Sequence, residues 1–117
     1  MEFSVSARSI DATIAAIGVH GEIDAFTAPK LKQEIIRQME GGIVRLAIDL
    51  SEVNYIDSAG LGALIGGLTR IRDRGGRLAL ICPVPRITRI FEITGLNRIF
   101  DLVSDEASAV ERLRGGL

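Results

Sequence analysis

Two short segments that are dense in apolar residues, 44–50 and 78–81, constrain the fold of this chain more than any other feature. A continuous apolar run of this length is typical of a strand that is covered on both faces, as in parallel sheets. Between the two runs, residues 58–74 repeat apolar side chains at helical spacing. Because parallel strands are joined by crossover connections, usually helices, this alternation predicts an α/β domain.

Other segments extend the pattern toward the N-terminus. Residues 3–8 alternate apolar and polar side chains, as a half-buried strand does, and residues 12–19 predict a second strand antiparallel to the first. We therefore predict a single domain over residues 1–117, with a small, mostly parallel sheet, an antiparallel edge strand and about four helices. The predicted core includes Ile48, Leu64, Leu68, Leu80 and Phe91. The apolar stripe predicted for the helix at 58–74 consists of Leu61, Leu64, Ile65, Leu68 and Ile71.

The composition excludes several classes of protein. Apolar residues make up 47% of the chain, enough for a core, but no run spans a membrane and no signal peptide is visible, which predicts a cytoplasmic protein. A single histidine, His20, and a single cysteine, Cys82, cannot form a zinc site or an internal disulfide, and we expect neither metal nor cofactor. The net charge of −1 predicts no binding to nucleic acid or membranes. We interpret one basic cluster as a solvated helix end: Arg70, Arg72, Arg74 and Arg77.

The chain also lacks the motifs of common enzymes. A hydrolytic serine needs an oriented base, but the motif G-x-S-x-G is absent and His20 is the only candidate base. Residues 60–66 (GLGALIG) nearly match G-x-G-x-x-G, although the third glycine is one place late and the run lies inside the predicted helix. We therefore predict no catalytic residues and favour a binding protein over an enzyme.

Ser58 stands where the strand at 44–50 gives way to the helix at 58–74. A hydroxyl at that position can accept a hydrogen bond from a free N–H group of the first turn, as a helix N-cap. It can also carry a phosphate, because free N–H groups and the helix dipole favour anions there. Position alone favours the cap.

The helix that begins near Ser58 is unusually rich in glycine. A glycine inside a helix costs about 1 kcal/mol relative to alanine, so four of them must be offset by packing or by function. Some of these glycines allow the helix to approach the sheet closely. If the large apolar stripe faces the core, part of the small-residue stripe faces outward and offers a flat docking surface for a partner. That stripe consists of Ala59, Gly62, Ala63 and Gly66.

Three segments together resemble the STAS domain family, and in particular the bacterial anti-sigma factor antagonists. They are residues 21–24 (GEID), residues 48–62 (IDLSEVNYIDSAGLG) and residues 91–100 (FEITGLNRIF). The resemblance covers almost the whole chain, and the Asp-Ser-x-Gly-Leu core at residues 57–61 is its most specific part.

The resemblance implies regulation by partner switching. In that family, the unphosphorylated antagonist binds an anti-sigma factor, which is a serine kinase, and so releases the sigma factor. The kinase phosphorylates the serine that matches Ser58 and ends binding, and a phosphoserine phosphatase reverses the reaction. Asp24 matches a loop carboxylate that helps to engage the kinase, and Asp57 precedes the phosphorylated serine as it does in the family.

With the resemblance added, phosphorylation of Ser58 becomes the favoured interpretation. The alternative is a scaffold subunit of a signalling or lipid-transport complex in which Ser58 is never phosphorylated. The predicted partner-binding residues are Asp24, Asp57, Ser58, Ala59, Gly62 and Gly66.

Overall fold

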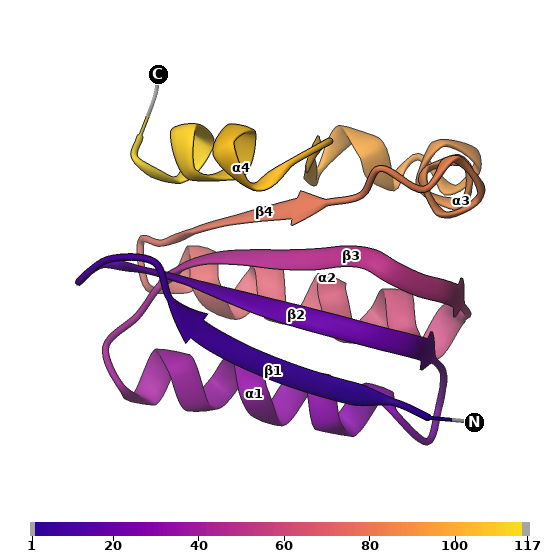
Figure 1. Ribbon diagram of the computed structural model, residues 1–117, viewed down its shortest axis with the longest axis horizontal. Coiled ribbons are helices and arrows are strands. Elements are labelled where there is room, and N and C mark those ends of the chain that lie inside the picture. The colour runs from indigo at the N-terminus through magenta and orange to yellow at the C-terminus, as the bar shows by residue number, and fades with distance from the viewer. Residues whose placement is uncertain (1, 116–117) are drawn as a thin grey trace.

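The computed structural model describes residues 2–115, which form one five-stranded sheet and four α-helices (Figure 1). The strands are β1 (Ser4–Ser9), β2 (Ile14–Ile23), β3 (Arg45–Ile56), β4 (Arg77–Ile81) and β5 (Asp101–Val103). The helices are α1 (Ala28–Glu40), α2 (Ser58–Asp73), α3 (Pro85–Thr94) and α4 (Glu106–Leu113), with a short 3₁₀ helix, η1 (Leu96–Arg98).

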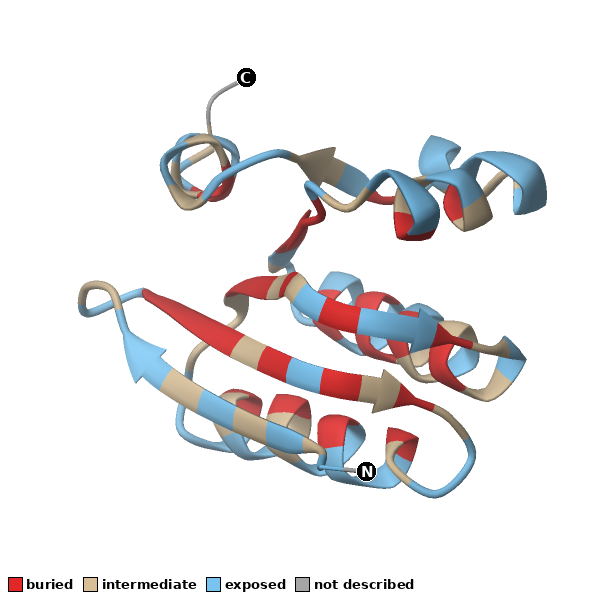
Figure 2. Cartoon of the chain, turned by 45° about the vertical axis from the view of Figure 1, so that its right-hand side comes forward, coloured by how far each residue is buried: buried red, intermediate tan, exposed pale blue. Residues whose placement is uncertain are grey.

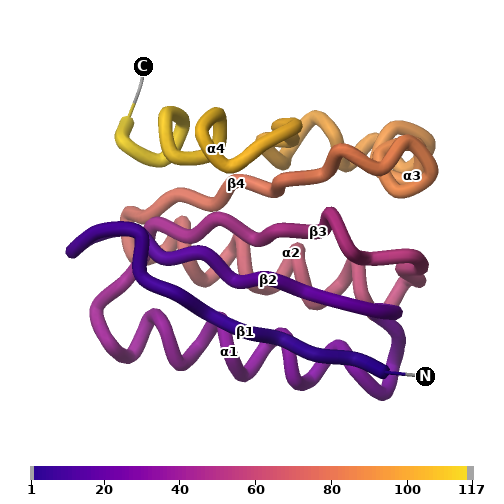
Figure 3. Tube along the Cα trace, viewed as in Figure 1, coloured from indigo at the N-terminus to yellow at the C-terminus, as the bar shows by residue number. Residues whose placement is uncertain are grey.

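The strands lie in sequence order across the sheet, β1-β2-β3-β4-β5. β1 pairs antiparallel with β2, and every later pair is parallel. The trace in Figure 3 shows β1 at one edge of the sheet, running alongside α1. The predicted α/β class, the mostly parallel sheet and the antiparallel edge strand are confirmed.

The two faces of the sheet carry cores of different size. Leu46, Ile48 and Leu50 of β3 point to the larger core, which α1, α2 and α3 complete. Ala47 points to the smaller core, where it meets Ala109 of α4. This split follows from the strand period of two, and the small alanines allow α4 to lie close to the sheet. In Figure 1, α2 passes behind β2 and β3, while α4 lies along β4.

The five predicted core residues are all buried, with at most 5% of their surface exposed. Figure 2 shows β2 buried along most of its length, whereas the edge strand β1 alternates between exposed and half-buried residues. The contrast arises because β2 lies inside the sheet, whereas β1 lies at its edge.

Two strands are longer than the sequence predicts. β2 continues past Val19 to Ile23, and β3 continues past Leu50 to Ile56. The extra residues pair with each other after two register shifts, so that Ile23 lies opposite Ile56. These stretches contain polar, exposed side chains, so a pattern of apolar residues does not predict that they belong to the strands. The extension brings both strands to the candidate site.

Ile65 corrects the predicted apolar stripe of α2. It is 36% exposed, whereas Leu64, Leu68 and Ile71 are buried. The buried face of α2 is completed by Gly60 and Gly67, and glycine is invisible in a count of large apolar residues. The helix is therefore rotated so that Ile65 faces solvent.

Leu68→Ala is expected to lower the free energy of unfolding by about 2–5 kcal/mol, because it leaves a cavity between α2 and the sheet. Urea unfolding measures this loss. Ile65→Ala, on the exposed side of the same helix, is the matched control and should cost less than about 1 kcal/mol. Equal losses for the two variants would contradict the orientation of α2.

Candidate functional site

The carboxyl ends of β2 and β3 place two loops side by side. Ile23 and Ile56 are register partners, and the N–H group of Asp57 donates a hydrogen bond of 3.2 Å to the carbonyl oxygen of Ile23. Asp24 and Asp57 follow these paired residues directly. The sheet thus brings together two carboxylates that are 33 positions apart in the sequence.

Asp57, not Ser58, is the N-cap of α2. Its backbone is extended, and its Oδ1 accepts hydrogen bonds from the N–H groups of Ala59 and Gly60 at 2.9 and 3.1 Å. The interpretation of Ser58 as the cap is therefore wrong. Asp57 and Ser58 are both good capping residues, and the backbone conformation at Asp57 decides between them.

Ser58 is consequently the first residue of α2, and its side chain is exposed. Within residues 2–115 its hydroxyl forms no hydrogen bond with another group of the protein, so it is free to react or to contact a partner. The sequence predicted that free N–H groups would receive an anion here. Two of those groups are already bound by the carboxylate of Asp57.

Gly60 fixes the position of this first helical turn. A Cβ atom at Gly60 would lie 2.7 Å from Cγ1 of Ile56 and 2.8 Å from the carbonyl oxygen of Ile23. Such distances are shorter than real Cβ contacts, so only glycine allows α2 to start directly against the strand ends. The turn that carries Ser58 therefore lies directly against the ends of β2 and β3.

The other glycines of α2 divide into two kinds. A Cβ atom at Gly67 would lie 2.9 Å from Cδ1 of Ile35, so Gly67 serves the close packing of α1 against α2. At Gly62 and Gly66 a Cβ atom would meet nothing within 4 Å. Packing therefore explains Gly60 and Gly67, and it leaves Gly62 and Gly66 unexplained.

Gly62 and Gly66 lie in an open groove of about 450 Å³ between α1 and α2. One end of the groove is formed by Ala25 and Ala59, which follow Asp24 and Ser58 in the sequence. Its only charged lining residues are Lys32 and Arg70. The remaining lining residues are small or apolar: Ala28, Pro29, Ile35, Ala63 and Gly67.

Asp24 organises the loop that leads from β2 into α1. Its Oδ1 accepts hydrogen bonds from the N–H groups of Phe26 and Thr27, at 2.9 and 3.1 Å. The hydroxyl of Thr27 in turn donates to the carbonyl oxygen of Glu22 at 2.7 Å. This compact loop holds the side chain of Phe26 outward, with 90% of its surface exposed.

Sequence reasoning missed part of the apolar surface at this site. Tyr55, three residues before Ser58, is 48% exposed. Ile65 lies seven residues, or about two helical turns, after Ser58, so the side chains of Ile65 and Ser58 point to the same side of α2. The exposure of Ile65 depends on the rotation of α2, which a pattern of apolar residues does not show. The term apolar anchors is used below for Phe26, Tyr55 and Ile65.

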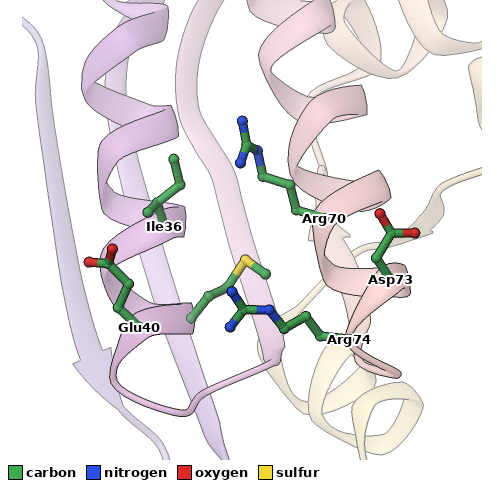
Figure 4. Close-up of a pocket in the computed structure, with 6 residues that line it drawn as sticks. Ile36, Glu40, Arg70, Asp73 and Arg74 are labelled. Carbon is green, nitrogen blue, oxygen red and sulfur yellow. The ribbon is translucent and has the colours of Figure 1, made fainter.

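A second hollow, of about 380 Å³, lies at the C-terminal ends of α1 and α2 (Figure 4). Arg70 and Arg74 extend from α2 toward α1, where Ile36 and Glu40 lie, whereas Asp73 points away from α1. The lining carries two arginines and two carboxylates, so its charges are balanced.

Residues 2–115 contain no group of three or more histidine, cysteine, aspartate or glutamate side chains that could hold a metal ion. No helix in the same range is long and apolar enough to cross a membrane.

Comparison with known proteins assigns this architecture to a family. The model of the STAS domain matches residues 6–109, and the chain belongs to the STAS domain family. It is 43% identical over 107 residues to the anti-sigma-B factor antagonist of Listeria monocytogenes, a match that covers 91% of this chain and 93% of the relative.

Two further relatives agree. The anti-sigma-B factor antagonist of Bacillus subtilis is 36% identical over 95 residues, which cover 81% of this chain and 86% of the relative. The crystal structure of an anti-sigma factor antagonist from Mycobacterium paratuberculosis superposes with a TM-score of 0.80 at 28% identity, covering 97% of this chain and 95% of the other.

Proposed function

We propose that this protein is an anti-sigma factor antagonist controlled by phosphorylation of Ser58. In its unphosphorylated form it binds an anti-sigma factor that is also a serine kinase, and this binding releases the sigma factor. Transfer of phosphate to Ser58 ends the binding, and a phosphoserine phosphatase restores it. The protein thus acts in the cytoplasm by binding, without catalysis of its own.

The free hydroxyl of Ser58 is the observation that carries the proposal. A kinase needs an accessible oxygen at a fixed position, and Asp57 releases Ser58 from the capping role. Gly60 fixes the turn on which Ser58 stands. The names of the relatives support the same function.

The proposed interface extends from Ser58 over the neighbouring surface. The open groove with Ala59, Gly62 and Gly66 accepts an apolar ridge of the partner, because nothing fills it. Asp24 and Asp57 are half-buried, and the Oδ1 atom of each accepts two backbone N–H bonds, so they act as fixed negative charges beside Ser58. The apolar anchors supply exposed side-chain area that a partner can bury.

The phosphorylation is tested by incubating the protein with its cognate anti-sigma factor and ATP, followed by intact-mass measurement. Wild type is expected to gain the mass of one phosphate group, and Ser58→Ala none. Ser104→Ala, which changes another exposed serine, is the matched control and should gain one phosphate as wild type does. A phosphate that still appears on Ser58→Ala would refute the assignment. Absence of any phosphate on wild type would favour the scaffold alternative.

Phe26→Ala is expected to weaken binding of the anti-sigma factor by about thirtyfold, the equivalent of about 2 kcal/mol for an aromatic hot spot. The free energy of unfolding should remain nearly unchanged, because 90% of the side chain is exposed. Calorimetric titration measures the affinity. Ile93→Ala removes another apolar side chain that is 76% exposed, on α3, and serves as the control. Equal affinities of the Phe26→Ala variant and wild type would remove Phe26 from the interface.

A further inference from the structure

A third hollow lies at the end of the domain opposite Ser58. It has a volume of about 280 Å³, is open to solvent, and is bordered by the last turns of α2, the start of β4 and the segment from η1 into β5. Ser58 and Arg72 stand at the two ends of α2, about 20 Å apart along the helix axis. The hollow is lined by Leu68, Arg72, Gly76, Arg77, Leu78, Arg98, Ile99, Phe100 and Asp101.

Three arginines of this hollow keep their charge uncompensated. Within residues 2–115, none of Arg72, Arg77 and Arg98 forms an ion pair with a carboxylate. Arg72 and Arg77 belong to the basic cluster that was predicted to form a solvated helix end. In the folded chain Arg98 of η1 lines the same hollow, although it is 21 residues further along the chain than Arg77.

Two of the arginines are also held in place. Arg72 Nη2 donates to the carbonyl oxygen of Ile99 at 3.1 Å, and Arg77 Nη1 donates to the carbonyl oxygen of Arg112 at 3.2 Å. A guanidinium has five N–H groups, so one bond to a neutral carbonyl leaves the charge and most donors available. A side chain that is already ordered loses less entropy when it binds a ligand.

The only carboxylate in the lining is already occupied. Asp101 Oδ1 accepts a hydrogen bond of 2.7 Å from Arg112 Nη1. The hollow at the ends of α1 and α2, by contrast, balances two arginines with two carboxylates. An anion is therefore favoured at the third hollow and not at the second.

The floor of the third hollow is apolar and rigid. Leu68, Leu78 and Phe100 are each at most 5% exposed. Phe100 also packs edge to face against Phe91, with ring centroids 5.7 Å apart. The volume lies just below the range of about 300–1,000 Å³ that is usual for drug-sized ligands, so the ligand is small.

We propose that this hollow binds a small oxyanion that carries two or more phosphate or carboxylate groups. The planar guanidinium groups of Arg72 and Arg98 can each donate two parallel N–H bonds to such groups, and Arg77, whose Nη1 is bonded to Arg112 of α4, adds a further positive charge. The proposal is independent of Ser58 and of the partner that binds there.

The test is titration of the full chain with pyrophosphate and, separately, with citrate, followed by calorimetry and by backbone amide chemical shifts. At least one of the two is expected to bind saturably with a dissociation constant below about 1 mM. The shifts should concentrate at Gly76, Arg98 and Ile99. Binding of pyrophosphate alone assigns the site to phosphates, binding of citrate alone assigns it to carboxylates, and binding of both assigns it to their shared oxyanion chemistry.

Arg98→Gln removes a side chain that donates no hydrogen bond within residues 2–115, so the fold should be retained. This variant is expected to weaken the anion affinity by about tenfold or more. Arg89→Gln, an equal change of charge on α3 outside the hollow, should bind as wild type does. The proposal is overturned if neither anion binds saturably, if Arg98→Gln binds as tightly as wild type, or if Arg89→Gln is weakened equally.

Discussion

Ser58→Asp is expected to bind the cognate anti-sigma factor at least about a hundredfold more weakly than Ser58→Ala does, a difference of roughly 3 kcal/mol. A carboxylate at Ser58 imitates part of the charge of a phosphate, which adds about −1.5 to −2 at pH 7. The new charge adjoins the carboxylate of Asp57, which occupies the N–H groups of Ala59 and Gly60. The charge therefore faces the partner, where desolvation and repulsion oppose binding.

Both Ser58 variants should unfold at nearly the wild-type temperature. The side chain is exposed, and neither substitution removes a hydrogen bond that the fold uses within residues 2–115. An acidic residue in the first turn of α2 also interacts favourably with the helix dipole. Calorimetric titration with the anti-sigma factor measures the affinities, with ADP in place of ATP so that the proposed kinase activity transfers no phosphate. If Ser58→Asp binds as tightly as Ser58→Ala, charge at this position does not control binding.

Gly62→Leu is expected to weaken the same complex by more than about thirtyfold, because the leucine would occupy the groove between α1 and α2 that we propose as the docking site of the partner. Gly66→Leu, one helical turn further along, should act in the same way. A Cβ atom at either position meets nothing within 4 Å, so the fold accepts the larger side chain. Replacing glycine within a helix should even stabilise α2 slightly.

Gly62→Ala is the matched control for the groove. It brings the same gain in helix propensity and adds only one methyl group, so most of the affinity should remain. Circular dichroism and thermal unfolding establish that each variant is folded, and calorimetry measures binding. Unchanged affinity of both folded leucine variants would show that the partner does not enter the groove.

The sequence predicts the layers of this fold well because its buried strands contain short apolar runs that are separated by helical patterns. It also places Ser58 correctly at the start of α2, since Asp57 and Ser58 are both typical of helix N-termini. The choice of Asp57 as the cap depends on backbone angles that the sequence does not reveal. The exposure of Ile65 depends on how closely Gly60 and Gly67 allow α2 to approach its neighbours.

Features that depend on contacts between distant segments of the chain were harder to predict from the sequence. The ends of β2 and β3 pair through polar residues and two register shifts, which an apolar pattern does not show. Arg98 joins Arg72 and Arg77 only because η1 folds back against the end of α2. Contacts of this kind arise from tertiary packing, and local propensity carries little information about them.

The tight seating of α2 on the strand ends, enforced at Gly60, has a consequence for the timing of the proposed signal. Because the turn already lies against the ends of β2 and β3, where the N–H group of Asp57 bonds to Ile23, we expect no slow rearrangement between modification of Ser58 and its effect. A partner meets either the hydroxyl or the phosphate on the same preformed surface. The response time is then set by how quickly the complex dissociates and re-forms, and stopped-flow binding kinetics should show a single phase for each phosphorylation state.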